Sequence, residues 1–64
     1  MNQHYVIELA GQSPDSWRSA VQNAINEASK SFDNIDEVEI TNLKAKVRNG
    51  DLVGYSANMK ISYS

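Results

Sequence analysis

The chain has 64 residues, eight acidic and six basic side chains, a net charge of −2 and no cysteine. This composition excludes disulfides and thiolate metal sites, and it argues against binding a phosphate backbone, which needs several cations on one surface. No apolar run approaches the roughly 18 residues of a membrane span. We therefore expect a cytoplasmic protein, with neither nucleic acid nor membrane as partner. A single domain, 1–64, buries too little surface to be more than marginally stable alone, so we expect it to oligomerise.

The first predicted element is a strand over residues 3–10, which alternate with Tyr5, Ile7 and Leu9 on one side. His4 falls on the other side, as expected for a solvent or interface residue rather than a catalytic base. The sequence has no phosphate loop, zinc-protease motif or paired catalytic carboxylates, so we do not expect an enzyme.

A helix is predicted next, from a start signal after Gly11 to about residue 31. Ser13 is the predicted N-cap, and Pro14 suits the first helical position. Apolar residues recur at spacings of three and four, which places them on one stripe of the helix. The stripe consists of Trp17, Ala20, Val21, Ala24, Ile25 and Ala28. We expect Phe32 to close one end of the contact between this stripe and the sheet.

Residues 33–36 predict a polar connection, and residues 38–47 predict a second strand. The apolar positions of this strand change phase, from even numbers up to Ile40 to odd numbers from Leu43 onward. An extra residue near Thr41 and Asn42 explains the change, since a bulge moves every later side chain to the opposite face. The alternative is a strand whose two faces are both partly buried, one of them against neighbouring subunits.

A third strand is predicted over residues 52–63, where apolar and polar residues alternate throughout. Asn49 and Gly50 precede it and favour a two-residue hairpin with the second strand. The predicted fold class is therefore α+β, with order β-α-β-β, in which a three-stranded antiparallel sheet of order 1-3-2 curls around one helix. The face away from the helix is the expected oligomer surface, and it carries Val6 with either Val38 and Ile40 or their odd-numbered neighbours.

Two segments carry a resemblance to a known family. Residues 6–17, VIELAGQSPDSW, continued by residues 20–30, AVQNAINEASK, resemble the first half of a dodecin. The length, the order of elements and the aromatic-rich last strand agree with that family over nearly the whole chain. The resemblance implies a homododecamer, a hollow sphere that binds small molecules without catalysing a reaction. Most characterised members hold flavins in pairs at two-fold interfaces.

Three positions of this chain match the family's flavin site. The tryptophan that stacks on the flavin ring corresponds to Glu37, the glutamine at the polar edge of the ring corresponds to Ser56, and an arginine of the second strand corresponds to Lys44. Lys44 keeps the charge without the planar guanidinium. The resemblance thus implies a ligand-binding position that has lost its flavin-stacking ring.

A second functional class stays open beside flavin binding or storage. The same hollow assembly could bind a metal ion or another small molecule, or act as a scaffold. Asp33, Asp36 and Glu39 are the candidate ligands for a divalent ion, although their spacing is not that of an EF-hand loop and a solvated turn is the simpler meaning. Twelvefold assembly would let a symmetry axis gather one carboxylate from each subunit.

Overall fold

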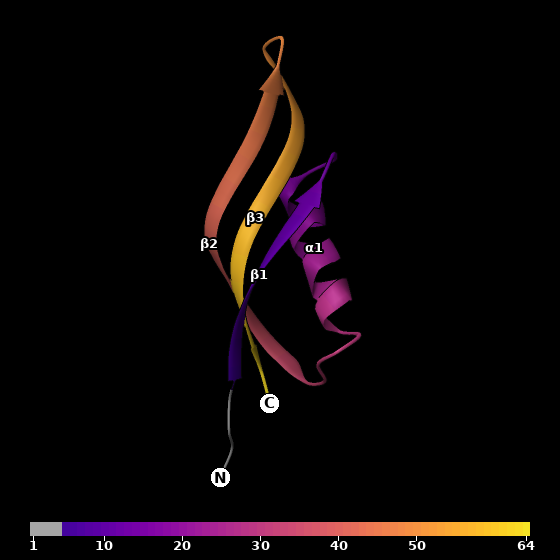
Figure 1. Ribbon diagram of the computed structural model, residues 1–64, viewed down its shortest axis with the longest axis vertical. Coiled ribbons are helices and arrows are strands. Elements are labelled where there is room, and N and C mark those ends of the chain that lie inside the picture. Colours follow the sequence, from indigo (N-terminus) through magenta and orange to yellow (C-terminus); the bar gives the residue numbers. More distant parts are fainter. Residues whose placement is uncertain (1–4) are drawn as a thin grey trace.

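The computed structural model describes residues 5–64, and His4 lies outside this range. Its elements are β1 (Tyr5–Ser13), α1 (Trp17–Ala28), β2 (Ile35–Arg48) and β3 (Asp51–Tyr63), arranged as Figure 1 shows. The strand order is β1-β3-β2, and both outer strands run antiparallel to β3. The predicted topology is confirmed.

The start of α1 differs from the sequence prediction. Ser13 is not its N-cap, because β1 continues to this residue, which is paired with Tyr55 of β3. The cap is Ser16, whose hydroxyl oxygen accepts a hydrogen bond from the backbone N–H of Ser19 at 3.0 Å. Ser13 instead accepts from the backbone N–H of Asp15 and stabilises the turn between strand and helix. Strand pairing, which the local start signal does not include, moves the helix start by three residues.

The helix also ends earlier than predicted, at Ala28 rather than near residue 31. Residues 29–31 form a turn, in which the backbone N–H of Phe32 donates to Ala28 O at 2.8 Å. This turn brings the ring of Phe32 to 4.5 Å from that of Tyr63, centroid to centroid. Phe32 therefore closes one end of the core, as the sequence predicted.

The core lies between α1 and the part of the sheet formed by β1 and β3. Its buried apolar residues in the described chain are Ala20, Ala24, Ala28, Ala57, Met59 and Ile61. The alanines let the helix backbone approach the sheet closely. At Gly11 of β1 this approach leaves no room for a side chain. A Cβ added at Gly11 would overlap Ala20 O and lie 3.0 Å from Ala24 Cβ.

The predicted bulge in β2 is present. Ile40 is opposite Met59 and Asn42 is opposite Asn58, so Thr41 is the extra residue. Its hydroxyl donates to Asn58 O at 3.2 Å, which supplies this carbonyl with a partner at the irregularity. β2 also begins at Ile35, inside the segment predicted to be a polar connection.

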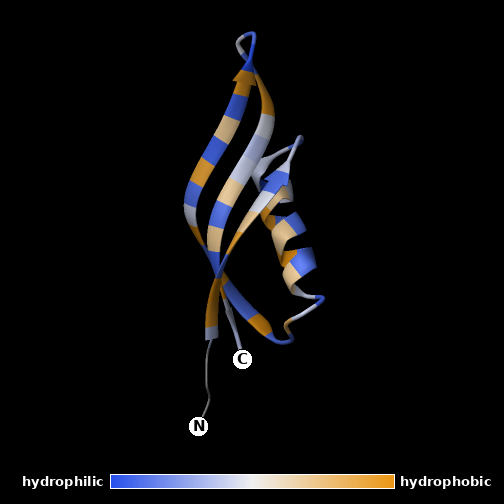
Figure 2. Ribbon diagram, viewed as in Figure 1, coloured by the Kyte–Doolittle hydropathy of each residue, from blue (hydrophilic) through white to orange (hydrophobic). Residues whose placement is uncertain are grey.

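The bulge keeps the apolar residues of β2 on the helix side of the sheet, although their numbering changes parity. Val38 and Ile40 precede the bulge and are opposite Ile61 and Met59, and Leu43 follows it opposite Ala57. Val38 and Ile40 are thus not on the outer face, where their odd-numbered neighbours lie instead. Hydrophobic and hydrophilic bands alternate along β2 in Figure 2. The outer face of β2 before the bulge is accordingly polar, whereas Val6 of β1, opposite Ser62, adds an exposed apolar residue to that face, as predicted.

The hairpin between β2 and β3 has two loop residues, both with positive φ: 52° at Asn49 and 82° at Gly50. The two strands extend beyond α1 and the end of β1 as a two-stranded ribbon (Figure 1). Apolar residues in this ribbon are exposed because no layer covers them. They are Val47, Leu52 and Val53.

Candidate ligand-binding site

The three positions matched to the flavin site do not meet within one chain. Lys44 and Ser56 are direct cross-strand partners, whereas Glu37 is opposite Ser62. Six residues of β3 separate Ser56 from Ser62, a distance of about 20 Å along a strand. A small ligand that contacts all three positions therefore needs residues from two chains.

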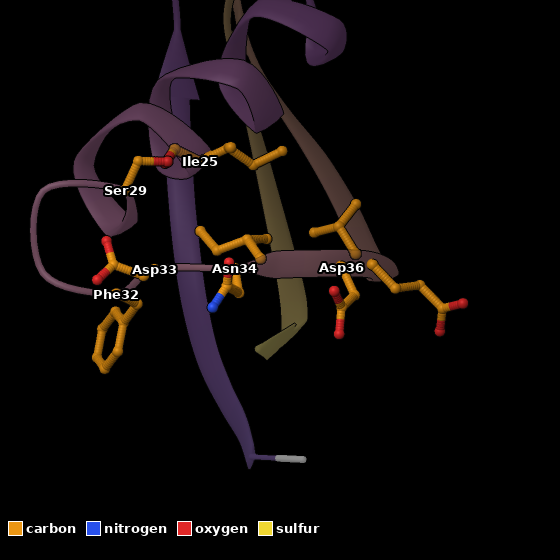
Figure 3. Close-up of a pocket in the computed structure, with 9 residues that line it drawn as sticks. Ile25, Ser29, Phe32, Asp33, Asn34 and Asp36 are labelled. Carbon is orange, nitrogen blue, oxygen red and sulfur yellow. The ribbon is translucent and has the colours of Figure 1, made fainter. Parts of the chain in front are cut away.

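Glu37 lies in an open hollow of about 610 Å³ between the end of α1 and the start of β2, here called the α1–β2 hollow (Figure 3). It is lined by residues 32–38 together with Ile25 and Ser29. Three acidic residues, Asp33, Asp36 and Glu37, line it, and no basic residue within 5–64 does. The hollow is therefore acidic.

Lys44 and Ser56 lie in a second hollow of about 430 Å³, here called the hairpin hollow. Residues 12–14, 44–46 and 53–56 line it. Lys44 and Lys46 are among its lining residues, and no acidic residue of the described chain is, so the charge of its lining is opposite to that of the α1–β2 hollow. Tyr55 and Val53 also line it, and a lining that is both basic and partly apolar suits an anionic molecule with an apolar part.

Trp17 holds the start of α1 onto β2 beside the hairpin hollow. Its indole Nε1 donates to Lys44 O at 2.9 Å, and its ring lies edge-on to that of Tyr55, with centroids 4.8 Å apart. The side chain is still 36% exposed. Trp17 is thus a packing residue at the rim of the helix contact, not a ring stacked within a closed pocket.

Sequence reasoning missed part of the hairpin hollow. Lys46, Gln12 and Tyr55 line it but were not candidates. Lys46 could have been found, since it has the same parity as Lys44 and therefore the same strand face. Gln12 could not, because only the pairing of β1 with β3 sets it opposite Ser56.

The predicted metal ligands are not gathered by the fold of one chain. No group of three or more His, Asp or Glu side chains suited to a metal ion occurs in residues 5–64. The carboxylates of Asp33 and Asp36 do not converge on one point in Figure 3. Glu39 is opposite Lys60, on the outer face. A cation bound here would need ligands from further chains.

A family model described as Dodecin matches residues 5–64. The chain belongs to the dodecin family. This dodecin has no match in a search of curated protein sequences. None of its helices in residues 5–64 is long and apolar enough to cross a bilayer.

Solved dodecin structures have the same fold. Dodecin from Streptomyces coelicolor is 28% identical, with a TM-score of 0.88 over 95% of this chain and 87% of its own. Dodecin from Streptomyces davaonensis is 26% identical, with a TM-score of 0.88 over 95% and 90%. A calcium dodecin from Mycobacterium tuberculosis, described as having a novel calcium-binding site, is 26% identical, with a TM-score of 0.84 over 98% and 90%. Membership of this family supports an oligomeric protein that binds small ligands.

Proposed function

We propose that the chain is one subunit of a non-catalytic homododecamer that binds a small molecule other than flavin. The observation that supports this proposal is the separation of Glu37 from Lys44 and Ser56 within one chain. Each subunit contributes two incomplete half-sites, so binding depends on assembly. The opposite charges of the two hollows further favour a ligand that is anionic at the hairpin hollow.

Flavin is disfavoured because Glu37 replaces an aromatic ring. Stacking contributes about 0.5–1.5 kcal/mol per ring pair beyond the area that it buries, and a two-fold axis doubles the loss. A carboxylate at the same place would also lose hydration on contact with the ring system. Ser56 is too short to replace a glutamine amide.

Titration of riboflavin fluorescence tests this prediction. We expect Glu37→Trp combined with Ser56→Gln to bind riboflavin at least about a hundredfold more tightly than the unmodified protein, equivalent to about 2.7 kcal/mol. Glu39→Trp is the matched control, because Glu39 lies two residues away on the same strand, and it should bring no gain. Submicromolar quenching by the unmodified protein would contradict the prediction.

Divalent cation binding is a second candidate, supported by the three carboxylates of the α1–β2 hollow and by the calcium site of the Mycobacterium tuberculosis relative. Because the described residues of one chain hold no complete ligand set, we expect an ion on a symmetry axis, with millimolar or weaker affinity. Asp33 and Asp36 remain the candidate ligands in this hollow, and Glu39 the candidate on the outer face.

Calorimetric titration with calcium, before and after chelation, tests this expectation. The double variant Asp33→Asn with Asp36→Asn should abolish the heat of calcium binding. Asp15→Asn, in the turn before α1, should leave that heat unchanged. Chelator should leave the mass of the assembly unchanged. If chelator released monomers, the ion would be structural and the prediction would be wrong.

A further inference from the structure

The charges of β2 are sorted along its length. Its first five residues include three carboxylates and no cation, and its last five include three cations and no carboxylate. The acidic residues are Asp36, Glu37 and Glu39, and the basic residues are Lys44, Lys46 and Arg48. β1, the other edge strand, has a single charged residue, Glu8. β2 is therefore polarised in a way that β1 is not.

Part of this charge is not balanced by the neighbouring strand. Glu39 is opposite Lys60 and Arg48 is opposite Asp51. Three of the other four have neutral neighbours on β3: Glu37 is opposite Ser62, Lys44 is opposite Ser56, and Lys46 is opposite Gly54. None of these three side chains forms an ion pair within residues 5–64.

β2 also has one free edge and an uncovered apolar strip. Within residues 5–64 it pairs only with β3, and α1 packs mainly on β1 and β3 (Figure 1). Ile40 is 41% exposed and Leu43 is 50% exposed, although both lie on the helix side of the sheet. A long edge strand with exposed apolar residues tends to acquire a partner.

We propose that β2 of one copy lies antiparallel beside β2 of a second copy around a two-fold axis, so that Glu37 of each chain pairs with Lys44 of the other. A two-fold contact is isologous, so each interface contains this pair twice. Parallel apposition would set the acidic half of one strand beside the acidic half of the other, and like charges directly opposite are destabilising.

The same register accounts for the apolar strip. The residue numbers of two antiparallel strands run in opposite directions. If Glu37 is opposite Lys44 of the second copy, Val38 is therefore opposite Leu43 of that copy. Both apolar residues lie on the helix side, and each would shield the other from water. Because Trp17 already donates to Lys44 O, the contact is one of side chains, not an uninterrupted backbone ladder.

This inference rests on the proposed assembly and adds how its half-sites meet. Within one chain Glu37 and Lys44 are about 20 Å apart along β2. Apposition would bring the α1–β2 hollow of one chain beside the hairpin hollow of the other. The ligand-binding position would then be partly occupied by a protein ion pair, which a small anion must displace from Lys44.

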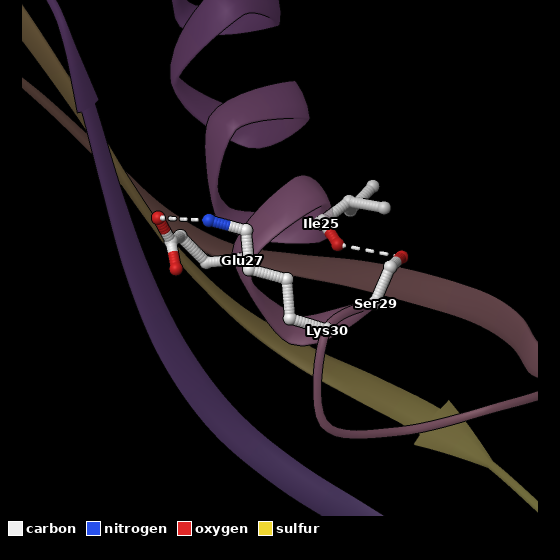
Figure 4. A network of polar contacts seen from close by, with 4 residues as sticks. All are labelled: Ile25, Glu27, Ser29 and Lys30. Atoms are coloured by element: carbon white, nitrogen blue, oxygen red, sulfur yellow. Dashed lines mark hydrogen bonds and ion pairs between the residues drawn. The ribbon is translucent and has the colours of Figure 1, made fainter.

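Charge reversal tests the pairing. In low-salt buffer, Glu37→Lys or Lys44→Glu should each raise the dissociation constant of the assembly at least about tenfold, measured by light scattering on dilution, because each makes both contacts repulsive. The double variant, Glu37→Lys with Lys44→Glu, should restore association. Reversing the exposed ion pair between Glu27 of α1 and Lys30 of the following turn is the matched control and should change nothing (Figure 4).

Zero-length cross-linking tests the same contact without mutation. A carbodiimide activates a carboxylate, and an adjacent amine then displaces it to form an amide. The carbodiimide leaves as a urea that carries away one carboxylate oxygen. In an assembly mixed from ¹⁴N- and ¹⁵N-labelled chains, Glu37–Lys44 peptides should carry both labels. Glu27–Lys30 peptides, whose Nζ and Oε1 atoms are 3.4 Å apart in one chain, should carry a single label.

The outcomes separate this inference from the proposed function. An unmodified chain that stays at 7.1 kDa would overturn both. An assembly in which the double variant is no better than the single variants, with no mixed-label Glu37–Lys44 peptide, would overturn the β2 contact alone. If circular dichroism shows that a single variant does not fold, the mixed-label cross-link on the unmodified chain tests the β2 contact instead.

Discussion

Gly11 is a residue of β1 that α1 approaches too closely to leave room for a side chain. The Cβ of Gly11→Ala would overlap the backbone carbonyl of Ala20, so the helix would have to move outward. We expect a loss of about 1–3 kcal/mol in the free energy of unfolding, as for other overpacked cores, measured by urea denaturation. Gly54→Ala is the control, because its Cβ would meet Lys46 Cβ at an ordinary 3.9 Å. Equal losses in the two variants would contradict this account of Gly11.

At the scale of an element, the β2–β3 hairpin depends on the backbone of its two loop residues. A Cβ at Gly50 has nothing within 4 Å, so only its φ of 82° opposes substitution. Gly50→Ala should therefore cost about 1–2 kcal/mol. Gly50→Asn should cost less, because asparagine tolerates this conformation. Thermal denaturation of both variants provides the measurement, and a larger loss for asparagine would show that backbone strain is not the cause.

At the scale of the molecule, the described chain has a thin core and an uncovered apolar strip on β2, so most of its stability should come from association. We expect a mass of twelve times 7.1 kDa, about 85 kDa, and a melting temperature above the ~45–65 °C of ordinary domains. Mass action also requires this temperature to rise with protein concentration. Calorimetry over a hundredfold range of concentration checks it. A folded 7.1 kDa species at micromolar concentration would rule out the prediction.

The sequence by itself predicted the topology and the hairpin, and it offered the bulge as one of two explanations for the change of phase in the second strand. Each rests on local signals: the alternation of residues 52–63, the turn preference of Asn49 and Gly50, and the change of phase around Thr41. These signals are local because strand faces and turn conformations depend on a few neighbouring residues. One extra residue reverses the parity of all later side chains, but burial on both faces would give the same pattern, so the register of β2 against β3 was needed to decide for the bulge.

Only the tertiary structure decided where α1 begins, which face of the sheet is apolar and which site residues share a hollow. Ser13 had every local feature of an N-cap, but its pairing with Tyr55 extends β1 and leaves the cap to Ser16. Glu37 and Lys44 are near in sequence, yet an extended strand holds them in separate hollows. Cross-strand register and the reach of α1 over the sheet are long-range properties, so no pattern within a single segment contains them.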